Sequence, residues 1–150
     1  MMYVAIKHKP QDTKVWWFSV PEELQDKVRI GAEALCITKR GTAPGTITCI
    51  MEGIPQSKAE KIIGGHFPLK SLMAVSMDFP MEEIHIPLNF VSNNPSPEKL
   101  AKRITEFYTT GKFDTPILIS PSGSLRDGYT AYLVAKMFAH DTLRGFCISD

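Results

Sequence analysis

The sequence predicts an α+β fold, with a small β-barrel-like module at the N-terminus followed by a mixed sheet with two to three helices. Residues 1–53 carry several short strand-like segments separated by turn residues. Residues 81–150 alternate strand-like and helix-like segments in the order β-α-β-α-β. Residues 54–80 lie between these zones and contain one short helical pattern. We therefore divide the chain into a β-rich module, a connector and a C-terminal domain.

The N-terminal module is predicted from four segments, YVAIKH, KVWWFSV, ALCITKR and GTITCIM, which are rich in β-branched and aromatic residues. A turn dense in Gly and Pro, residues 40–45, joins the last two. Short strands at this spacing favour a small barrel or a strongly bent sheet. Trp16 and Trp17 point to opposite faces of one strand. One face must pack in the core, and the other could stack on a base or fit a partner's groove.

The helices are predicted from their end signals. In the connector, Ser57 is a candidate N-cap and Gly64 would end the helix. In the C-terminal domain, Ser96 precedes Pro97 at the first helical position, and Gly111 closes a helix with one apolar face. Extended chain is expected at residues 82–91, 115–120 and 143–149.

The composition of the chain limits which classes of function are expected. Lys plus Arg number 17 against 16 for Asp plus Glu, so a general polyanion-binding surface is not indicated, although a local basic patch is not excluded. The three cysteines have no CxxC spacing and no secretion signal precedes them, which favours a reducing compartment. No apolar run is long enough to span a membrane, and we expect a cytoplasmic protein. The four histidines, His66 among them, show no metal-binding spacing, so no metal site is predicted.

One stretch, SLRDGYTAYLVAK from residue 124 to 136, joins a turn signal directly to a helical pattern. Asp127 is a candidate N-cap for that helix. Alternatively, its carboxylate could act as a catalytic acid or base, bind a metal or hold a ribose hydroxyl. Tyr129 and Thr130 fall in the first turn, where a hydroxyl could face a phosphate. Arg126 and Arg144 could supply positive charge, or could simply be solvent-exposed.

In their order and spacing, four pieces of the C-terminal domain resemble the ParB/sulfiredoxin-like domain. They are Ile84–Pro87, the helix from Pro97 to Thr110, Pro116–Ile119 and the segment from Leu125 to Ala135. The resemblance implies a mixed sheet whose signature loop lies against a phosphate. In this chain the phosphate would contact the loop residues Arg126, Asp127, Gly128, Tyr129 and Thr130. Arg144 would be a further cation near the phosphate. The first zone is similar, less distinctly, to small β-barrels found at the front of DNA-processing enzymes.

This sequence departs from the family pattern at specific positions. Ala131 stands where the family usually has an arginine, so phosphoryl transfer by the family mechanism is not implied. Asp127 and Gly128 stand where sulfiredoxins need a cysteine. The helix-turn-helix that follows this domain in ParB partition proteins is not present in the sequence up to Asp150, so we expect no DNA binding by that route.

The resemblance leads to one main hypothesis and two alternatives. The main one is a ParB-like nucleotide- or nucleic-acid-binding regulatory protein, an assignment compatible with a phage or mobile-element origin. The first alternative is a ParB-like nuclease or a nucleotide-dependent phosphotransferase or hydrolase, with Asp127 as the catalytic acid. The second is a protein-interaction module with a vestigial ligand site. A nucleotide with Mg²⁺ is the candidate cofactor, a protein partner or a homodimer is compatible with each hypothesis, and no membrane partner is expected.

Overall fold

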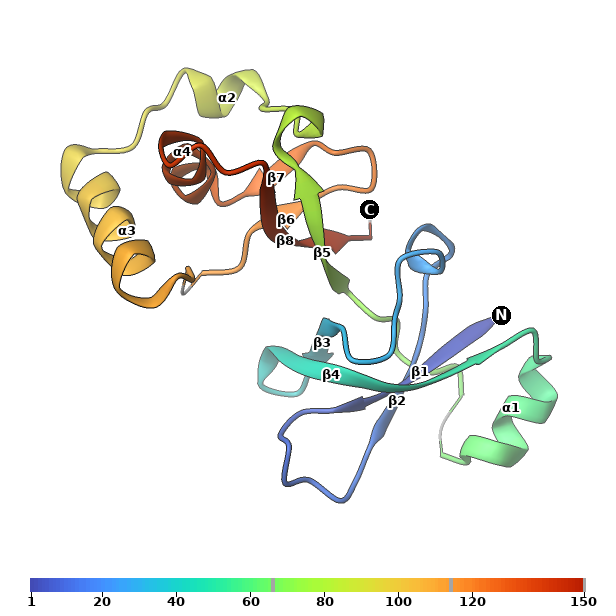
Figure 1. Cartoon of the computed structure of the whole chain (residues 1–150). Coiled ribbons are helices and arrows are strands. Elements are labelled where there is room, and N and C mark those ends of the chain that lie inside the picture. Colours follow the sequence, from blue (N-terminus) through green and yellow to red (C-terminus); the bar gives the residue numbers. More distant parts are fainter. Residues whose placement is uncertain (66, 114, 150) are drawn as a thin grey trace. The chain divides into compact units, whose positions relative to one another are not determined.

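This computed structural model describes residues 1–65, 67–113 and 115–149, and Figure 1 labels its helices and strands. The hydrogen-bonded strands form one open mixed sheet. Neighbouring strands are hydrogen-bonded in the order β2-β1-β4-β3-β5-β8-β6-β7. The chain divides into two compact units, residues 1–76 with Ser149, and residues 77–148. No helix within the described residues is long and apolar enough to cross a bilayer.

The prediction of a closed N-terminal barrel is wrong. The sheet is open, because β2 is an edge strand with β1 as its only strand neighbour among the described residues. On the other side, β3 pairs with β5, through Ala34 opposite Val75 and Leu35 opposite Ala74, and the sheet continues to β8. The sequence also placed the C-terminal strands in a sheet of their own, whereas they belong to this same hydrogen-bonded sheet. The α+β character is compatible with the structure.

The first unit is built from two antiparallel hairpins. Its elements are β1 (Met2–Lys7), β2 (Trp16–Ser19), the 3₁₀ turn η1 (Glu22–Leu24), β3 (Glu33–Thr38), β4 (Gly41–Glu52), α1 (Gln56–Ile63) and the start of β5 (Ala74–Pro80). Five consecutive residues of β1, Met2–Ile6, are buried, so both faces of this central strand are covered. The predicted helix of the connector begins at Gln56, one residue before its expected N-cap Ser57, and ends at Gly64 as predicted.

Two cysteines of the first unit lie apart in the β3–β4 hairpin. Cys36 faces Ala43 in the register of that hairpin, and Cys49 pairs with Ala5 of β1. The hairpin therefore does not place the two thiols opposite each other. Burial raises the pKa of the Cys36 thiol to about 11, because the thiolate would lose its hydration. Cys36 is thus a neutral core side chain at physiological pH.

The second unit carries the remaining helices and the shortest strands. Its elements are the rest of β5, the 3₁₀ turn η2 (Met81–Glu83), α2 (Leu88–Val91), α3 (Pro97–Thr110), β6 (Leu118–Ile119), β7 (Leu125–Asp127), α4 (Tyr129–Met137) and β8 (Thr142–Ile148). β6 runs parallel to β8 and antiparallel to β7. The segment expected to be extended at residues 82–91 instead contains η2, a single bridge between His85 and Ser124, and α2, which begins directly after Pro87.

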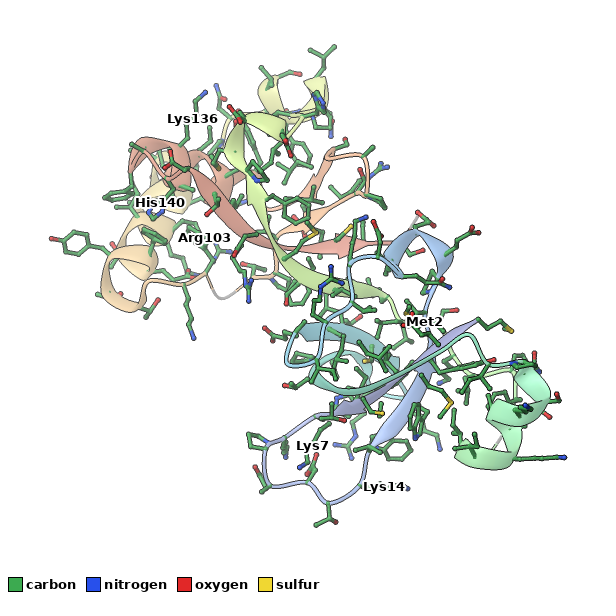
Figure 2. All side chains as sticks on the ribbon, turned by 45° about the vertical axis from the view of Figure 1, so that its right-hand side comes forward. Met2, Lys7, Lys14, Arg103, Lys136 and His140 are labelled. Carbon is green, nitrogen blue, oxygen red and sulfur yellow. The ribbon has the colours of Figure 1, made fainter. Side chains whose placement is uncertain are left out.

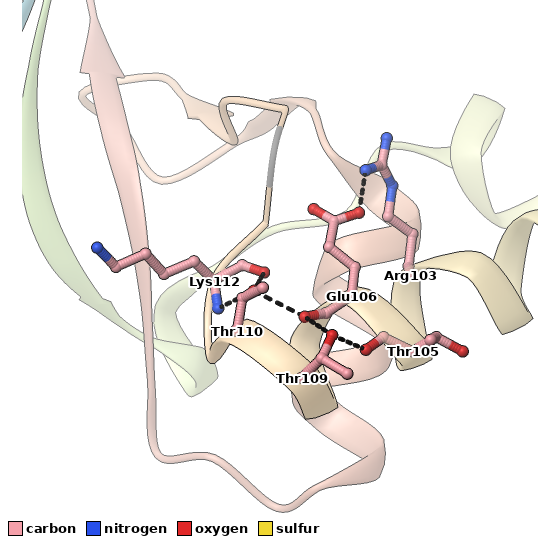
Figure 3. Close-up of polar contacts among 6 residues, drawn as sticks. All are labelled: Arg103, Thr105, Glu106, Thr109, Thr110 and Lys112. Atoms are coloured by element: carbon pink, nitrogen blue, oxygen red, sulfur yellow. Dashed lines mark hydrogen bonds and ion pairs between the residues drawn. The ribbon is translucent and has the colours of Figure 1, made fainter.

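Helix α3 has the end signals that the sequence predicts. The Ser96 hydroxyl accepts a hydrogen bond from the Lys99 amide at 3.2 Å, Pro97 begins the helix, and Gly111 ends it in the left-handed conformation. Figure 3 shows its last turns, where the hydroxyl of Thr110 donates to the Glu106 carbonyl at 2.7 Å and accepts from the Lys112 amide. These bonds are local to the end of the helix.

Candidate ligand site at the start of helix α4

The turn between β7 and α4 is fixed by one glycine. Gly128 has a φ of +99°, a conformation that side-chain-bearing residues rarely adopt. A Cβ atom at this position would also lie 3.0 Å from the Cγ1 atom of Ile117 and 3.2 Å from its Cα. Both the dihedral angle and the contact with Ile117 therefore require glycine, and the chain enters α4 in one defined orientation.

Asp127 is not the N-cap of α4, so this prediction is wrong. It is the last residue of β7, and the N-cap is Gly128, with no side chain of the described residues making a capping bond. The Asp127 carboxylate instead accepts a hydrogen bond from the Gly128 amide at 2.8 Å and stays exposed. The physical reason is the left-handed Gly128, which ends the strand and starts the helix one residue after Asp127.

The first turn of α4 combines buried and half-buried side chains. Thr130 and Ala131 are buried, and Tyr129 is half-buried. The Tyr129 ring lies 5.5 Å from the Phe90 ring of α2 and 6.4 Å from the Tyr132 ring. Because Thr130 is buried, its hydroxyl is not exposed to a phosphate bound at the surface of the helix start. The aromatic side chains at the mouth of α4 form a small cluster of their own.

The structure separates the two candidate arginines. Arg126 lies in β7, is exposed and directly precedes Asp127. Arg144 lies in β8 and forms an ion pair with Asp78 of β5 at 3.3 Å, between two well-exposed side chains. Because β5 and β6 flank β8 on opposite sides, this ion pair directs Arg144 away from β7. Arg126 is therefore the arginine adjacent to the α4 turn.

The two tryptophans belong to the other compact unit. Trp16 is 49% exposed at the start of the edge strand β2, and Trp17 is half-buried. The Nζ atom of Lys14 lies 4.1 Å above the centre of the Trp16 ring, which is a cation–π contact. The strand thus places one tryptophan at the surface beside a cation.

Metal ligands do not gather anywhere in the part of the chain that the structure describes. No group of three or more His, Cys, Asp or Glu residues is close enough to hold an ion there, and His66 lies outside the described residues. At the α4 turn, the single Asp127 carboxylate suits Mg²⁺ only as one ligand beside phosphate oxygens and water, which is how nucleotide-bound Mg²⁺ is commonly held.

Sequence patterns did not point to two residues that shape this site. Phe90 reaches Tyr129 from α2, in a segment expected to be extended, and Pro87 was the only signal that a helix could begin there. Ile117 contacts the Gly128 position from the segment just before β6.

No protein-family model, no curated protein and no solved structure matches this chain. The resemblance to the ParB/sulfiredoxin-like domain therefore rests on the quoted residues.

Proposed function

We propose that this chain is a nucleotide- or nucleic-acid-binding regulatory protein of the ParB/sulfiredoxin-like kind, acting in the cytoplasm, which holds a phosphate at the start of α4. The observation that carries the proposal is the turn at Gly128. It presents the first amides of a nine-residue helix without a side-chain cap. Such amides, together with the positive end of the helix dipole, favour an anion.

The neighbouring side chains support a nucleotide better than a bare phosphate. Arg126 adds positive charge on one side of the turn, and Asp127 can share a Mg²⁺ ion with the phosphate. The half-buried Tyr129 and Phe90 rings offer an aromatic surface for a base. Ala131, where the family has its arginine, is buried and cannot stabilise developing charge, so binding is proposed in preference to nuclease or phosphotransferase activity.

The proposal is tested by adding Mg²⁺-ATP, AMP and inorganic phosphate to ¹⁵N-labelled protein. We expect amide shifts centred on residues 127–131, with the nucleotides binding more tightly than phosphate alone. Arg126→Ala should weaken nucleotide binding about three- to tenfold, as expected for the loss of one charged contact. Arg144→Ala is the matched control, because strand β6 lies between its strand β8 and β7, and it should leave binding unchanged. Shifts elsewhere, or equal effects of the two variants, would contradict the site.

A second candidate function is a protein-interaction module with a vestigial ligand site. It is supported by the contacts of Tyr129 with both Phe90 and Tyr132, since rings that pack on one another can occupy the space a base would need. Tyr108, Met137 and Phe138, large side chains exposed near the ends of α3 and α4, would then serve a protein partner or a second copy. Absence of nucleotide binding, with concentration-dependent dimerisation in light scattering, would favour this alternative.

A further inference from the structure

Several cations of the first unit are concentrated at one end of its strands. β1 ends at Lys7, which is paired with Thr46 of β4. Because β4 runs antiparallel to β1, its earlier residues lie further along the direction in which β1 points. The β3–β4 turn at Lys39 and Arg40 therefore projects from the same end of the sheet as the β1–β2 loop.

We call this the basic end of the first unit. Its cations come from the two connections between strands, and they are Lys7, Lys9, Lys14, Lys39 and Arg40. The opposite end has mixed charge: Glu52 pairs with Met2 at the start of β1, and Glu22, Glu23, Asp26, Lys27 and Arg29 follow the end of β2. Figure 2 labels Lys7 and Lys14 beside the β1–β2 loop and Met2 at the other end of β1.

The cations of the basic end are available to a ligand. Lys9, Lys14, Lys39 and Arg40 are exposed and Lys7 is half-buried. Among the described residues, none of the five forms an ion pair. The acidic residue within the β1–β2 loop, Asp12, accepts a hydrogen bond from the Lys9 backbone amide at 3.0 Å. By contrast, Lys27, at the opposite end of the unit, is paired with Asp26 at 3.2 Å.

Two local structures hold the basic end in place. The His8 ring bonds through Nδ1 to the Pro44 carbonyl at 2.9 Å, which ties the start of the β1–β2 loop to β4. Gly45 permits this approach, because a Cβ atom there would overlap the Ile6 side chain and lie 3.2 Å from His8 Nδ1. The β3–β4 turn is closed by the Thr38 hydroxyl, which donates to the Gly41 carbonyl at 2.8 Å. The β1–β2 loop is thus held to β4, and the β3–β4 turn is closed by a bond between its own two strands.

An aromatic ring lies beside one of these cations, Lys14. Trp16 begins β2, directly after the β1–β2 loop, and is 49% exposed on the edge strand of the sheet. Lys14 lies 4.1 Å above its ring centre. Exposed aromatic rings stack on unpaired bases, and nearby lysines neutralise the adjacent phosphates, which is how sequence-tolerant single-strand binders work. Paired bases would hide the faces that Trp16 could stack on.

We infer that the basic end of the first unit binds single-stranded nucleic acid, with Trp16 stacking on a base and Lys14, Lys39 and Arg40 contacting phosphates. The inference rests on the nucleic-acid form of the proposed function and names the ligand class. It involves no residue of the α4 turn. A nucleic-acid strand that runs from the β1–β2 loop to the β3–β4 turn meets Trp16 and Lys14 first and Lys39 and Arg40 further along, so charge and stacking act on the same ligand.

The test uses the full chain and a fluorescein-labelled oligothymidylate of about 20 nucleotides, followed by fluorescence anisotropy at about 50 to 200 mM salt. Reversing two charges in Lys39→Glu/Arg40→Glu should weaken binding at least about tenfold. The slope of log K against log salt should become shallower by about 0.7 for each phosphate that the variant no longer neutralises. The matched control is Lys58→Glu/Lys61→Glu on exposed positions of α1, which makes the same charge change outside the basic end and should retain binding.

The stacking role is tested separately with Trp16. Trp16→Ala should weaken binding about tenfold with an almost unchanged salt slope, because it removes a ring and no charge. Trp16→Phe keeps a stacking surface and should recover most of the affinity. Far-UV circular dichroism of each variant verifies that the sheet remains folded, and the Phe variant keeps the test decisive if the Ala variant unfolds.

Three outcomes would overturn the inference. They are equal binding by wild type and Lys39→Glu/Arg40→Glu, an equal loss in the α1 control, or tighter binding of the corresponding duplex. The experiment also separates this surface from the α4 site. Failure of the α4 proposal would appear as absent nucleotide shifts at residues 127–131, with oligothymidylate binding intact. Failure of the present inference would appear as the reverse.

Discussion

Helices α3 and α4 begin in opposite ways. At α3, the Ser96 hydroxyl accepts from the Lys99 amide, and Pro97 occupies the first position, where an amide proton would have no partner. At α4, a left-handed Gly128 precedes the helix and no side chain of the described residues makes a capping bond. The start of α3 is therefore stabilised by residues adjacent to it in the sequence. The start of α4 is positioned by a tertiary contact, that of Gly128 with Ile117.

The difference shows what a capping signal means for function. A side-chain cap stabilises a helix and occupies the amides that an anion would use. Helix α4 has no side-chain cap and is stabilised instead by the packing of its buried residues, which are Thr130, Ala131, Val134 and Ala135. Helix α3 has no buried residue and depends more on its caps. The comparison predicts how substitutions at the two starts should differ.

The largest effect is expected for Gly128→Val. A β-branched residue is strained at a φ of +99°, and its Cβ would press on Ile117, so we expect a loss of roughly 3 kcal/mol or more in the free energy of unfolding. Urea unfolding followed by circular dichroism measures it. Gly111→Ala, at φ +71° with open space around the Cβ, is the control and should lose about 1 kcal/mol. Similar losses for both would mean that the Ile117 contact is unimportant.

A smaller effect is expected for Ser96→Ala. The change removes the hydroxyl that accepts from the Lys99 amide, so α3 should lose about 1 kcal/mol. Hydrogen exchange at the amides of residues 98–100 measures the loss locally, and Ser96→Asp, which keeps a capping acceptor, should restore protection. If protection is unchanged in the Ala variant, the cap does not stabilise this helix.

The smallest effect is expected for Asp127→Ala. Among the described residues, its carboxylate accepts only from the adjacent Gly128 amide, and it is exposed, so the loss should be about 0.5 kcal/mol or less. The same urea unfolding experiment measures it beside Ser96→Ala. A loss as large as that of Ser96→Ala would show that Asp127 effectively caps α4, and would remove the contrast between the two helix starts.

Local signals predicted the elements whose causes are local. Ser96, Pro97 and Gly111 give the limits of α3 because caps act over a few residues. Two strands were expected on either side of residues 40–45, but the turn predicted there is wrong, because β4 already begins at Gly41 and the chain turns at residues 39–40. Asp127-Gly128 indicated a turn before α4. The same signals placed the cap one residue early at Asp127, because the left-handed Gly128 is required by Ile117, which no pattern near residue 128 reveals.

The pairing between strands could not be predicted from the sequence, and two features of the first unit depend on it. The barrel was predicted from the spacing of short strands, but closure depends on which edges meet, and β3 pairs with β5 from a segment interpreted as a connector. Similarly, the charge count of residues 1–53 is nearly even, and only the register of β1 with β4 shows that Lys7 and the Lys39–Arg40 turn share one end. Lys14, Lys39 and Arg40 therefore had no signal as ligand contacts, whereas Trp16 did.

The position of the cations in the first unit has a kinetic consequence. A body whose cations without ion-pair partners are concentrated at one end has an uneven electrostatic field, and the field of a polyanion turns it as it approaches. Encounters with the basic end leading would then be favoured. Such steering decays over a Debye length of about 10 Å at 0.1 M salt, so association should slow with added salt far more than dissociation quickens.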